Sequence, residues 1–320
     1  MLEPTRERPA RTAPVGEIPA LGGMVQTAAD RPEPILRPGS TNCGGCGMSI
    51  VWNLLSHASA AVKVQIVIPA CCGIVSPGKF PFSAYGAPVI SSTFASTAAV
   101  ATGLAQVANM NGDPTRVVCF AGDGGTYDIG MATLSAAAER NEDLLYICYD
   151  NEIYGNTGGQ RSSATPMGAS TTTTPDGETL PKKDILSIMA AHRVPYAASV
   201  SLAHLDDTMR KLRYALDRRG FRFLHVLSPC PTGWKSEPAE GIDLIRYAIR
   251  SGLYPIFEVF DGFRTVVNLE PDFDDEALEK YFAAQGRFRK STLKLEAVRE
   301  EIRRYWEILR SRTGLGTVAG

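Results

Sequence analysis

The sequence lacks several features that would mark a specialised class of protein. Lysine plus arginine number 33 and aspartate plus glutamate 34, so no excess of charge indicates a nucleic-acid partner or an anionic membrane surface. No apolar run is long enough to span a bilayer, and the Arg- and Pro-rich N-terminus has no secretory apolar core. We therefore expect a cytoplasmic protein with no nucleic-acid partner and no membrane association.

Cysteine is too scarce for a disulfide scaffold, since there are seven in 320 residues. An intracellular setting also disfavours disulfides. The length and a hydrophobic content of 44% allow one large α/β domain or two smaller ones with ample core. The positions of the cysteines are more informative than their number.

The stretch from 120 to 160 has the pattern of strand, glycine-rich turn, helix, strand and polar turn. An apolar run over 117–121 stops at the glycine-rich turn 122–125, and an Ala- and Leu-rich helix is expected over 131–140. A second apolar run over 144–149 ends at Asp150 and Asn151. These parts make one βαβ unit, whose ligand site belongs outside the carboxyl ends of its strands.

Asp123 and Asn151 are expected at that ligand-binding edge. A carboxylate and an amide oxygen are ligand types that Mg²⁺ accepts together with phosphate oxygens. The glycines beside Asp123 allow backbone N–H groups to approach a phosphate. The chemistry indicates a site for magnesium and a diphosphate; the alternative, favoured for a lone Gly-Asp-Gly, is a polar turn after a strand.

Cysteines recur where other elements begin or end. Cys43 and Cys46 form a CxxC before a helix expected over 48–60, and strand-like runs over 62–69 and 221–227 end next to further cysteines, Cys71, Cys72 and Cys230. Four thiolates are the number needed by a [4Fe-4S] cluster, and they also suit zinc. A CxxC by itself also suits a redox pair.

Strands alternating with helices indicate a doubly wound sheet. We predict helices over 92–108, 182–192, 205–218 and 241–252, and strands near 196–199 and 254–260. An extended arm is expected over 1–38, an α/β domain over 39–270 and a helical segment over 271–320. His57, His192, His204 and His225 are expected to be surface or packing residues.

Longer strings carry a resemblance to a known family. Asn151 follows Asp123 by 28 positions, and the string YDNEIYGNTGGQRSSATPMGASTTTTP spans 149–175. The spacing resembles the thiamine diphosphate motif. The string resembles β subunits of pyruvate:ferredoxin oxidoreductases, within the 2-oxoacid:ferredoxin oxidoreductase family. The resemblance covers about 36–269 and implies an α/β fold with a doubly wound, mostly parallel sheet of the thiamine diphosphate-binding type.

The resemblance implies which residues bind the cofactor. Asp123, the Asn151 side chain and the Ile153 carbonyl would hold magnesium, and Asn156 would be the catalytic residue near the reacting carbon. Further cofactor contacts are implied for Gly122, Gly124, Gly125, Glu152, Tyr154, Gly155, Cys72 and Met48. Met48 stands where many relatives have Glu, and its thioether is only a weak acceptor, so substrate preference or local potential is expected to differ.

The resemblance also implies a [4Fe-4S] cluster. Its ligands would be Cys43, Cys46, Cys230 and one of Cys71 or Cys72. The segment GIVSPGKFPFSAY that follows matches the family without a gap only with Cys72 in register, so Cys72 is preferred. The two other cysteines lie inside apolar runs and are expected to be buried, inert thiols: Cys119 and Cys148.

The implied activity is oxidative decarboxylation of a 2-oxo acid, with pyruvate the preferred substrate. Coenzyme A would take up the acyl group, and electrons would leave to ferredoxin or flavodoxin. An α subunit would carry the 2-oxoacid pocket and the activating glutamate, with γ and ferredoxin-like δ subunits completing the assembly. The alternatives are another 2-oxo acid or oxalate, a non-redox thiamine diphosphate decarboxylase or synthase with structural zinc, and an inactive cofactor-binding subunit.

Overall fold

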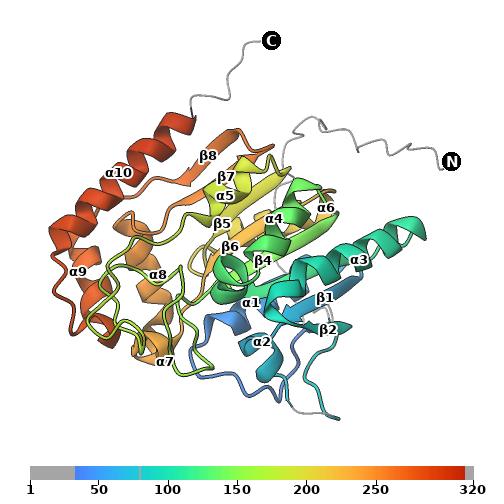
Figure 1. The fold of residues 1–320 in the computed structure, drawn as a ribbon, viewed down its shortest axis with the longest axis horizontal. Helices are drawn as coiled ribbons and strands as arrows, with labels where there is room; N and C mark the ends of the chain where they lie inside the picture. Colours follow the sequence, from blue (N-terminus) through green and yellow to red (C-terminus); the bar gives the residue numbers. More distant parts are fainter. Residues whose placement is uncertain (1–32, 79–80, 314–320) are drawn as a thin grey trace.

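The structure is a computed structural model that describes residues 33–78 and 81–313. Its strands form one eight-stranded sheet in the order β2-β1-β3-β4-β6-β5-β7-β8 (Figure 1). The strands are β1 (Val64–Pro69), β2 (Val89–Ser92), β3 (Arg116–Gly122), β4 (Leu144–Asp150), β5 (Tyr196–Val200), β6 (Arg222–Leu227), β7 (Ile256–Phe260) and β8 (Arg264–Leu269). The pairs among β1 to β6 are parallel, whereas β7 pairs antiparallel with β5 and β8 with β7. The predicted α/β fold with a mostly parallel sheet is confirmed.

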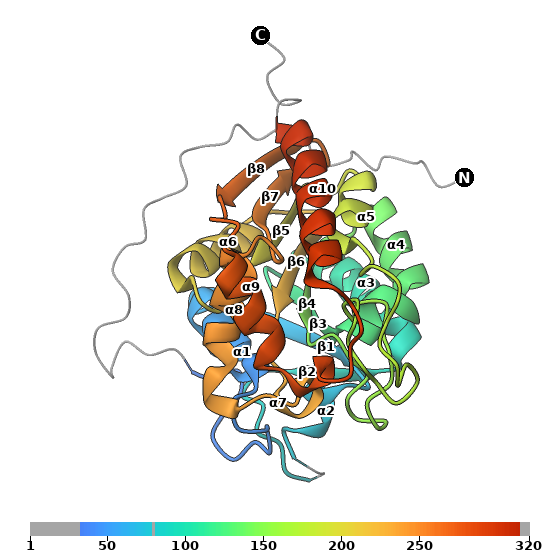
Figure 2. The same ribbon diagram turned by 90° about the vertical axis from the view of Figure 1, so that its left-hand side faces the viewer.

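Helices cover both faces of this sheet (Figure 2). They are α1 (Gly47–Ala58), α2 (Cys72–Val75), α3 (Thr97–Met110), α4 (Met131–Glu139), α5 (Ile185–Ala191), α6 (Leu205–Asp217), α7 (Pro231–Trp234), α8 (Gly241–Arg250), α9 (Asp275–Ala283) and α10 (Leu295–Thr313). Helices α3, α4, α5 and α10 pack on one face, and α1 and α6 on the other. No helix in the described part of the chain is long and apolar enough to cross a membrane.

Burial on both faces of the sheet explains why β3 is apolar from Val117 to Ala121. In β3, Val117, Cys119 and Ala121 pack into one core cluster, whereas Val118 and Phe120 pack into the other. Side chains of a strand alternate between the faces of a sheet, so a strand covered on both faces needs apolar residues throughout. The apolar run that predicted this strand is therefore a direct consequence of its central place.

Several element boundaries differ from the prediction. The helix predicted over 92–108 begins only at 97, because Ser92 ends β2 and residues 94–96 form the 3₁₀ turn η2 (Phe94–Ser96). Strands β2 and β8 were not predicted, and the C-terminal segment contains two helices, α9 and α10, joined by η5 (Gly286–Phe288). The predicted N-terminal arm lies outside the described residues up to residue 32, and residues 314–320 lie outside them as well.

Candidate cofactor and metal site

The predicted site residues gather at the carboxyl edge of the parallel strands. Strands β1, β3 and β4 are adjacent and end at Pro69, Gly122 and Asp150. The segments that follow them line one cleft, formed by Ala70, Cys71, Cys72, Phe94, Gly122, Asp123, Gly124, Tyr149, Asn151, Ile153, Tyr154, Gly155, Asn156 and Thr157. The ends of parallel strands meet at one edge, so sequence-distant motifs are brought together here.

Three oxygen-bearing groups converge in this cleft. The side-chain amide of Asn151 lies 2.8 Å from Asp123 Oδ1 and 2.9 Å from the carbonyl oxygen of Ile153. With its nitrogen toward them, the amide donates two hydrogen bonds. With its oxygen toward them, three oxygens face one point, which is the arrangement that a cation would stabilise.

The carboxyl group of Asp123 has little else to neutralise it. The residue is 1% exposed, and its Oδ2 accepts a hydrogen bond from Ser162 Oγ. Burial, followed by the charge of nearby Asp150, raises the pKa of Asp123 well above its ordinary value. An ionised Asp123 is therefore unfavourable in the cleft unless a positive charge joins it.

The glycine-rich turn leaves no room for a side chain at Gly124. Residues 124–128 form the π-helical turn η3 (Gly124–Asp128), and Thr126 Oγ1 donates to the Gly122 carbonyl at 2.8 Å. A Cβ atom at Gly124 would lie 2.3 Å from Cε1 of Tyr154. Gly122 and Gly124 line the cleft, and Tyr154 lies over Gly124, with its hydroxyl donating to the Gly124 carbonyl at 3.2 Å. The lack of a side chain at Gly124 allows this close approach.

Glu152 takes a different position from the other predicted contacts. It has a left-handed backbone, with φ of 65°, and its carboxylate pairs with Lys182 at 3.0 Å and Arg287 at 2.6 Å, away from the cleft. The Trp234 indole donates to the Asn151 carbonyl at 2.9 Å. These contacts fix the turn that carries Asn151 and Ile153, although Glu152 itself does not line the cleft.

Beneath the turn lies a buried polar network that the sequence analysis missed. Asp150 pairs with Lys182 at 2.5 Å and with His225 Nε2 at 2.8 Å, and it accepts from Tyr127 at 3.0 Å. Burial alone would raise the pKa of Asp150, but Lys182 and then His225 outweigh it and lower that pKa. His225, which was expected to be a surface or packing residue, is buried in this network, and no local pattern links it to Asp150.

Cys72 lines the cleft, and three further thiols lie near it: Cys43, Cys46 and Cys230. Cys46 and Cys230 precede the first turns of α1 and α7, and Cys72 begins α2. Burial, and then the charges of Cys72, Cys46 and Cys43, raise the pKa of Cys230 to about 11, against the lowering effect of the Gly233 N–H. Among the described residues, no three His, Cys, Asp or Glu side chains are close enough to hold one metal ion.

The two adjacent cysteines point in different directions. Cys71 is 6% exposed and belongs to a core cluster, and burial raises its pKa to about 11. The Cys72 thiol donates to Asn156 Oδ1 at 3.5 Å, and the charges of Cys43 and Asp123 act on it. Both cysteines line the cleft, but Cys72 is the member of the pair that lies closer to Cys43 and contacts Asn156.

The remaining predicted residues lie outside the cleft lining. Met48 is 1% exposed and packs in a core cluster from α1, and Gly125 is nearest to the Phe94 ring and Pro69. Cys119 and Cys148 are fully buried within β3 and β4, as predicted.

Sequence comparison first gives the class of this site. Residues 75–226 match the family model of the thiamine pyrophosphate enzyme C-terminal TPP binding domain. A solved 2-oxoglutarate:ferredoxin oxidoreductase from Magnetococcus marinus superposes with a TM-score of 0.54 at 24% identity, covering 64% of this chain and 76% of that one. The fold is thus that of a thiamine diphosphate-binding domain.

Closer relatives define the family. Pyruvate synthase subunit PorB from Methanothermobacter thermautotrophicus is 42% identical, with 81% of this chain and 91% of PorB covered. Ketoisovalerate oxidoreductase subunit VorB from Pyrococcus furiosus is 39% identical, with 85% of this chain and 91% of VorB covered. The chain therefore belongs to the β subunits of the 2-oxoacid:ferredoxin oxidoreductase family, and the resemblance seen in the sequence is confirmed.

Proposed function

We propose that this chain binds thiamine diphosphate, Mg²⁺ and one [4Fe-4S] cluster as the β subunit of a 2-oxoacid:ferredoxin oxidoreductase. The enzyme oxidatively decarboxylates a 2-oxo acid, in the first place pyruvate, forms the acyl-coenzyme A and passes electrons to ferredoxin or flavodoxin. The observation that supports this proposal most directly is that oxygens of Asp123, Asn151 and Ile153 lie together in the cleft that Cys72 also lines.

The spacing of the oxygens suits magnesium. Mg²⁺ binds oxygens at about 2.0–2.1 Å in an octahedron, so neighbouring ligands lie about 2.8–3.0 Å apart. The Asn151 amide lies 2.8 Å from Asp123 Oδ1 and 2.9 Å from the Ile153 carbonyl oxygen. Asp123, the Asn151 amide oxygen and the Ile153 carbonyl oxygen would hold magnesium, whose positive charge would favour an ionised Asp123, beside the turn at Gly124.

The four thiols suit a cluster ligand set of Cys43, Cys46, Cys72 and Cys230. Their mutual electrostatic influence indicates proximity, yet they do not gather around a single-ion position among the described residues. A four-iron cluster holds its thiolates farther apart than one zinc ion does, because each thiolate binds a different iron. All these ligands lie within 39–270, which we assign to one cofactor-binding domain.

Thiamine diphosphate supplies a carbanion for the 2-oxo carbon, and the cluster accepts single electrons. This chain orients the reactants around them. Asn156 would position the substrate carbonyl by hydrogen bonding from the side of Cys72, which it contacts at 3.5 Å. The buried network at Asp150, with Lys182 and His225, keeps the magnesium-binding turn in place.

The cleft requires other subunits for completion. Its enclosed volume is about 50 Å³, which is far below the roughly 300–1,000 Å³ of small-molecule sites. The described residues thus form one wall of a cofactor pocket. We assign the facing wall, with the activating glutamate and the 2-oxoacid pocket, to an α subunit, and electron transfer onward to ferredoxin-like δ and γ subunits, in the cytoplasm.

A branched 2-oxo acid is the second candidate substrate, because VorB relatives stand beside PorB relatives at similar identity. The test is an anaerobic assay of the complex purified through a tag on this chain. Ferredoxin reduction is followed with coenzyme A and pyruvate, 2-oxoisovalerate, 2-oxoglutarate or oxalate. We expect the highest kcat/KM with pyruvate. Preference for 2-oxoisovalerate would establish the second candidate, and no reduction by a cofactor-loaded complex with any substrate would contradict the proposed activity.

A further inference from the structure

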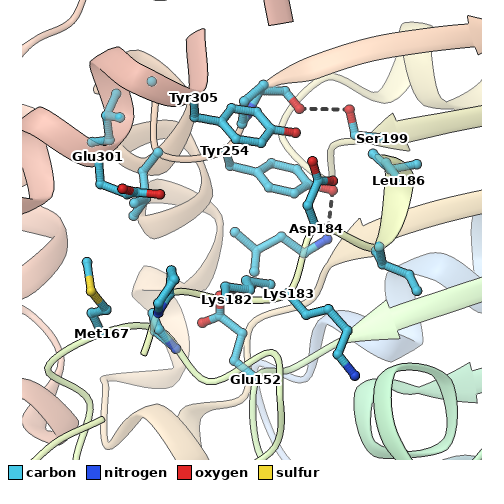
Figure 3. A pocket seen from close by; sticks show the side chains of 18 of the residues that line it. Glu152, Met167, Lys182, Lys183, Asp184, Leu186, Ser199, Tyr254, Glu301 and Tyr305 are labelled. Carbon is cyan, nitrogen blue, oxygen red and sulfur yellow. Dashed lines mark hydrogen bonds and ion pairs between the residues drawn. The ribbon is translucent and has the colours of Figure 1, made fainter. Parts of the chain in front are cut away.

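A second cavity lies behind the cofactor-binding turn (Figure 3). Its volume is about 300 Å³, and it shares no lining residue with the cofactor cleft. Glu152 lines this cavity, whereas its neighbours Asn151 and Ile153 line the cleft, so the turn itself separates the two spaces. The volume is at the lower end of the range for sites that bind small molecules.

The walls of the cavity are mainly apolar. Val298 and Ile302 of α10, Leu186 of α5 and Phe257 of β7 contribute to them, and Met167 lies on the loop at the lower side of the view. Glu301 and Tyr305 of α10 face the cavity from the upper side (Figure 3). A ligand with an apolar body would find close contacts on several elements at once.

One end of the cavity carries a charged donor with spare capacity. The Lys182 ammonium has three N–H groups, and its ion pairs with Asp150 and Glu152 use two of them. A quarter of the Lys182 side-chain surface stays accessible. The nearby hydroxyl of Tyr254 is already engaged with the His225 carbonyl, so the ammonium is the available donor at this end.

The charges around this end are balanced without a ligand. Lys182 and Arg287 are cationic, and Asp150 and Glu152 pair with them as carboxylates. An ionised ligand would add a buried charge with no partner, which is unfavourable in a low-dielectric site. A neutral oxygen acceptor can take the third N–H of Lys182 without upsetting the balance.

We propose that this cavity is a binding site for an uncharged amphipathic small molecule, whose oxygen accepts from Lys182 and whose apolar part packs against α10 and β7. Lys182 and Glu152 belong both to the cavity and to the support of the 151–154 turn. The second part of the proposal rests on the proposed function: a ligand bound in the cavity changes the affinity of that turn for magnesium and thiamine diphosphate.

Binding is tested on the full-length chain with octan-1-ol as the probe, by calorimetry without cofactor. Octanoate and octylammonium match the chain length of octanol but carry a charge. We expect each to bind more weakly than octanol by a factor of about ten or more. Ile302→Phe fills the cavity and should weaken octanol binding by about tenfold, whereas Ile308→Phe on the exposed side of α10 should not.

Absence of octanol binding, or octanoate binding as tightly as octanol, would overturn the assignment even if Ile302→Phe failed to fold. Equal octanol affinity in a folded Ile302→Phe variant would place the probe elsewhere and overturn it too. A second titration measures the thiamine diphosphate affinity of the complex purified with its partner subunits, with and without saturating octanol, and we expect a change of about fivefold. Octanol binding without any such change would reject the coupling alone, and cofactor binding that is absent in both titrations would reject the proposed function instead.

Discussion

This chain provides few contacts that stabilise an ionised carboxylate at Asp123. Its carboxyl group is buried, receives a hydrogen bond from Ser162 and lies near the ionised Asp150. A raised pKa means that the folded chain holds the proton of Asp123 more tightly than the unfolded chain does. Such an arrangement costs stability at neutral pH and is consistent with a place for a cation rather than with a role in folding.

Asp123→Asn should therefore separate binding from stability. Without its charge the residue no longer opposes burial, so the free energy of unfolding without cofactor should stay unchanged or rise by about 1 kcal/mol. Magnesium-dependent retention of thiamine diphosphate should fall by about tenfold or more. Urea unfolding and cofactor analysis after desalting measure the two effects. Asp113→Asn, at an exposed carboxylate, is the matched control, and normal cofactor content in Asp123→Asn would refute the site.

Cys71 and Cys72 differ in surroundings, and their serine variants should differ in kind. Cys72→Ser removes a thiol that faces the other thiols, so iron and sulfide content should fall by most of one cluster per chain. Cys71→Ser should keep the cluster and lose about 1 kcal/mol of stability, because a hydroxyl replaces a thiol in a core cluster. The reverse pattern of iron contents would make Cys71 the ligand.

The buried thiol of Cys230 predicts a pH dependence for the cluster-free chain. Its pKa is raised from 9.0 to about 11, so the unfolded chain ionises first as the pH increases. The associated stability is complete below about pH 9 and is lost as the pH rises through 11, on the order of 2 kcal/mol in all. Urea unfolding at pH 8 and pH 10.5 should show a smaller loss in Cys230→Ser than in the wild type. An equal loss in both would mean that other groups cause it.

The turn after β3 is the element in which local backbone space matters most. At Gly124 a Cβ atom would lie 2.3 Å from Cε1 of Tyr154, whereas at Gly103, within α3, a Cβ would meet nothing within 4 Å. Gly124→Ala should thus displace Tyr154 into the cleft and reduce cofactor affinity by about tenfold or more.

Gly103→Ala is the matched control for this substitution. It should leave cofactor affinity unchanged and stabilise the chain by about 0.5–1 kcal/mol, because alanine favours a helix interior. Cofactor titration and thermal unfolding of the two variants provide the comparison. If Gly124→Ala bound thiamine diphosphate as tightly as Gly103→Ala, the turn would have no part in the site.

The sequence predicted best those elements whose residue pattern follows from a single local requirement, such as burial on both faces or close packing. The strand at Val117 and the helix at Met131 have continuous or small-residue patterns, because central strands are buried on both faces and tightly packed helices need small side chains. β2 escaped prediction because four residues with two serines form no distinctive run, and its pairing with β1 supplies the stabilisation.

The sequence predicted which residues share the cleft only where they belong to contiguous strings. Asp123 and Asn151 follow strands whose ends the topology brings together, so chemistry and position could be inferred jointly. The residues that support the turn could not be inferred from the sequence. Lys182 reaches Glu152 from a loop, and Arg287 reaches it from a turn after α9. Only the folded chain shows that Glu152 faces away from the cleft.

At the scale of the whole molecule, one turn lies between two spaces. The cofactor cleft and the thiols border one side of the 151–154 segment, and the apolar cavity under α10 borders the other. The ion pair between Arg287 and Glu152 holds this turn to the C-terminal part of the chain. Changes in the C-terminal helical segment are therefore expected to reach the proposed metal ligands, Asn151 and Ile153, through this contact.

The central claim is that this chain holds thiamine diphosphate and a [4Fe-4S] cluster together. Its most direct test is anaerobic purification of the chain with its co-eluting subunits, followed by iron, zinc and thiamine diphosphate analysis and low-temperature EPR after reduction. We predict about four irons for this chain beyond those of its partners, bound thiamine diphosphate and a reducible cluster signal that Cys46→Ser removes. Zinc in place of iron, with no reducible cluster, would contradict the account and place the protein among the non-redox decarboxylases and synthases.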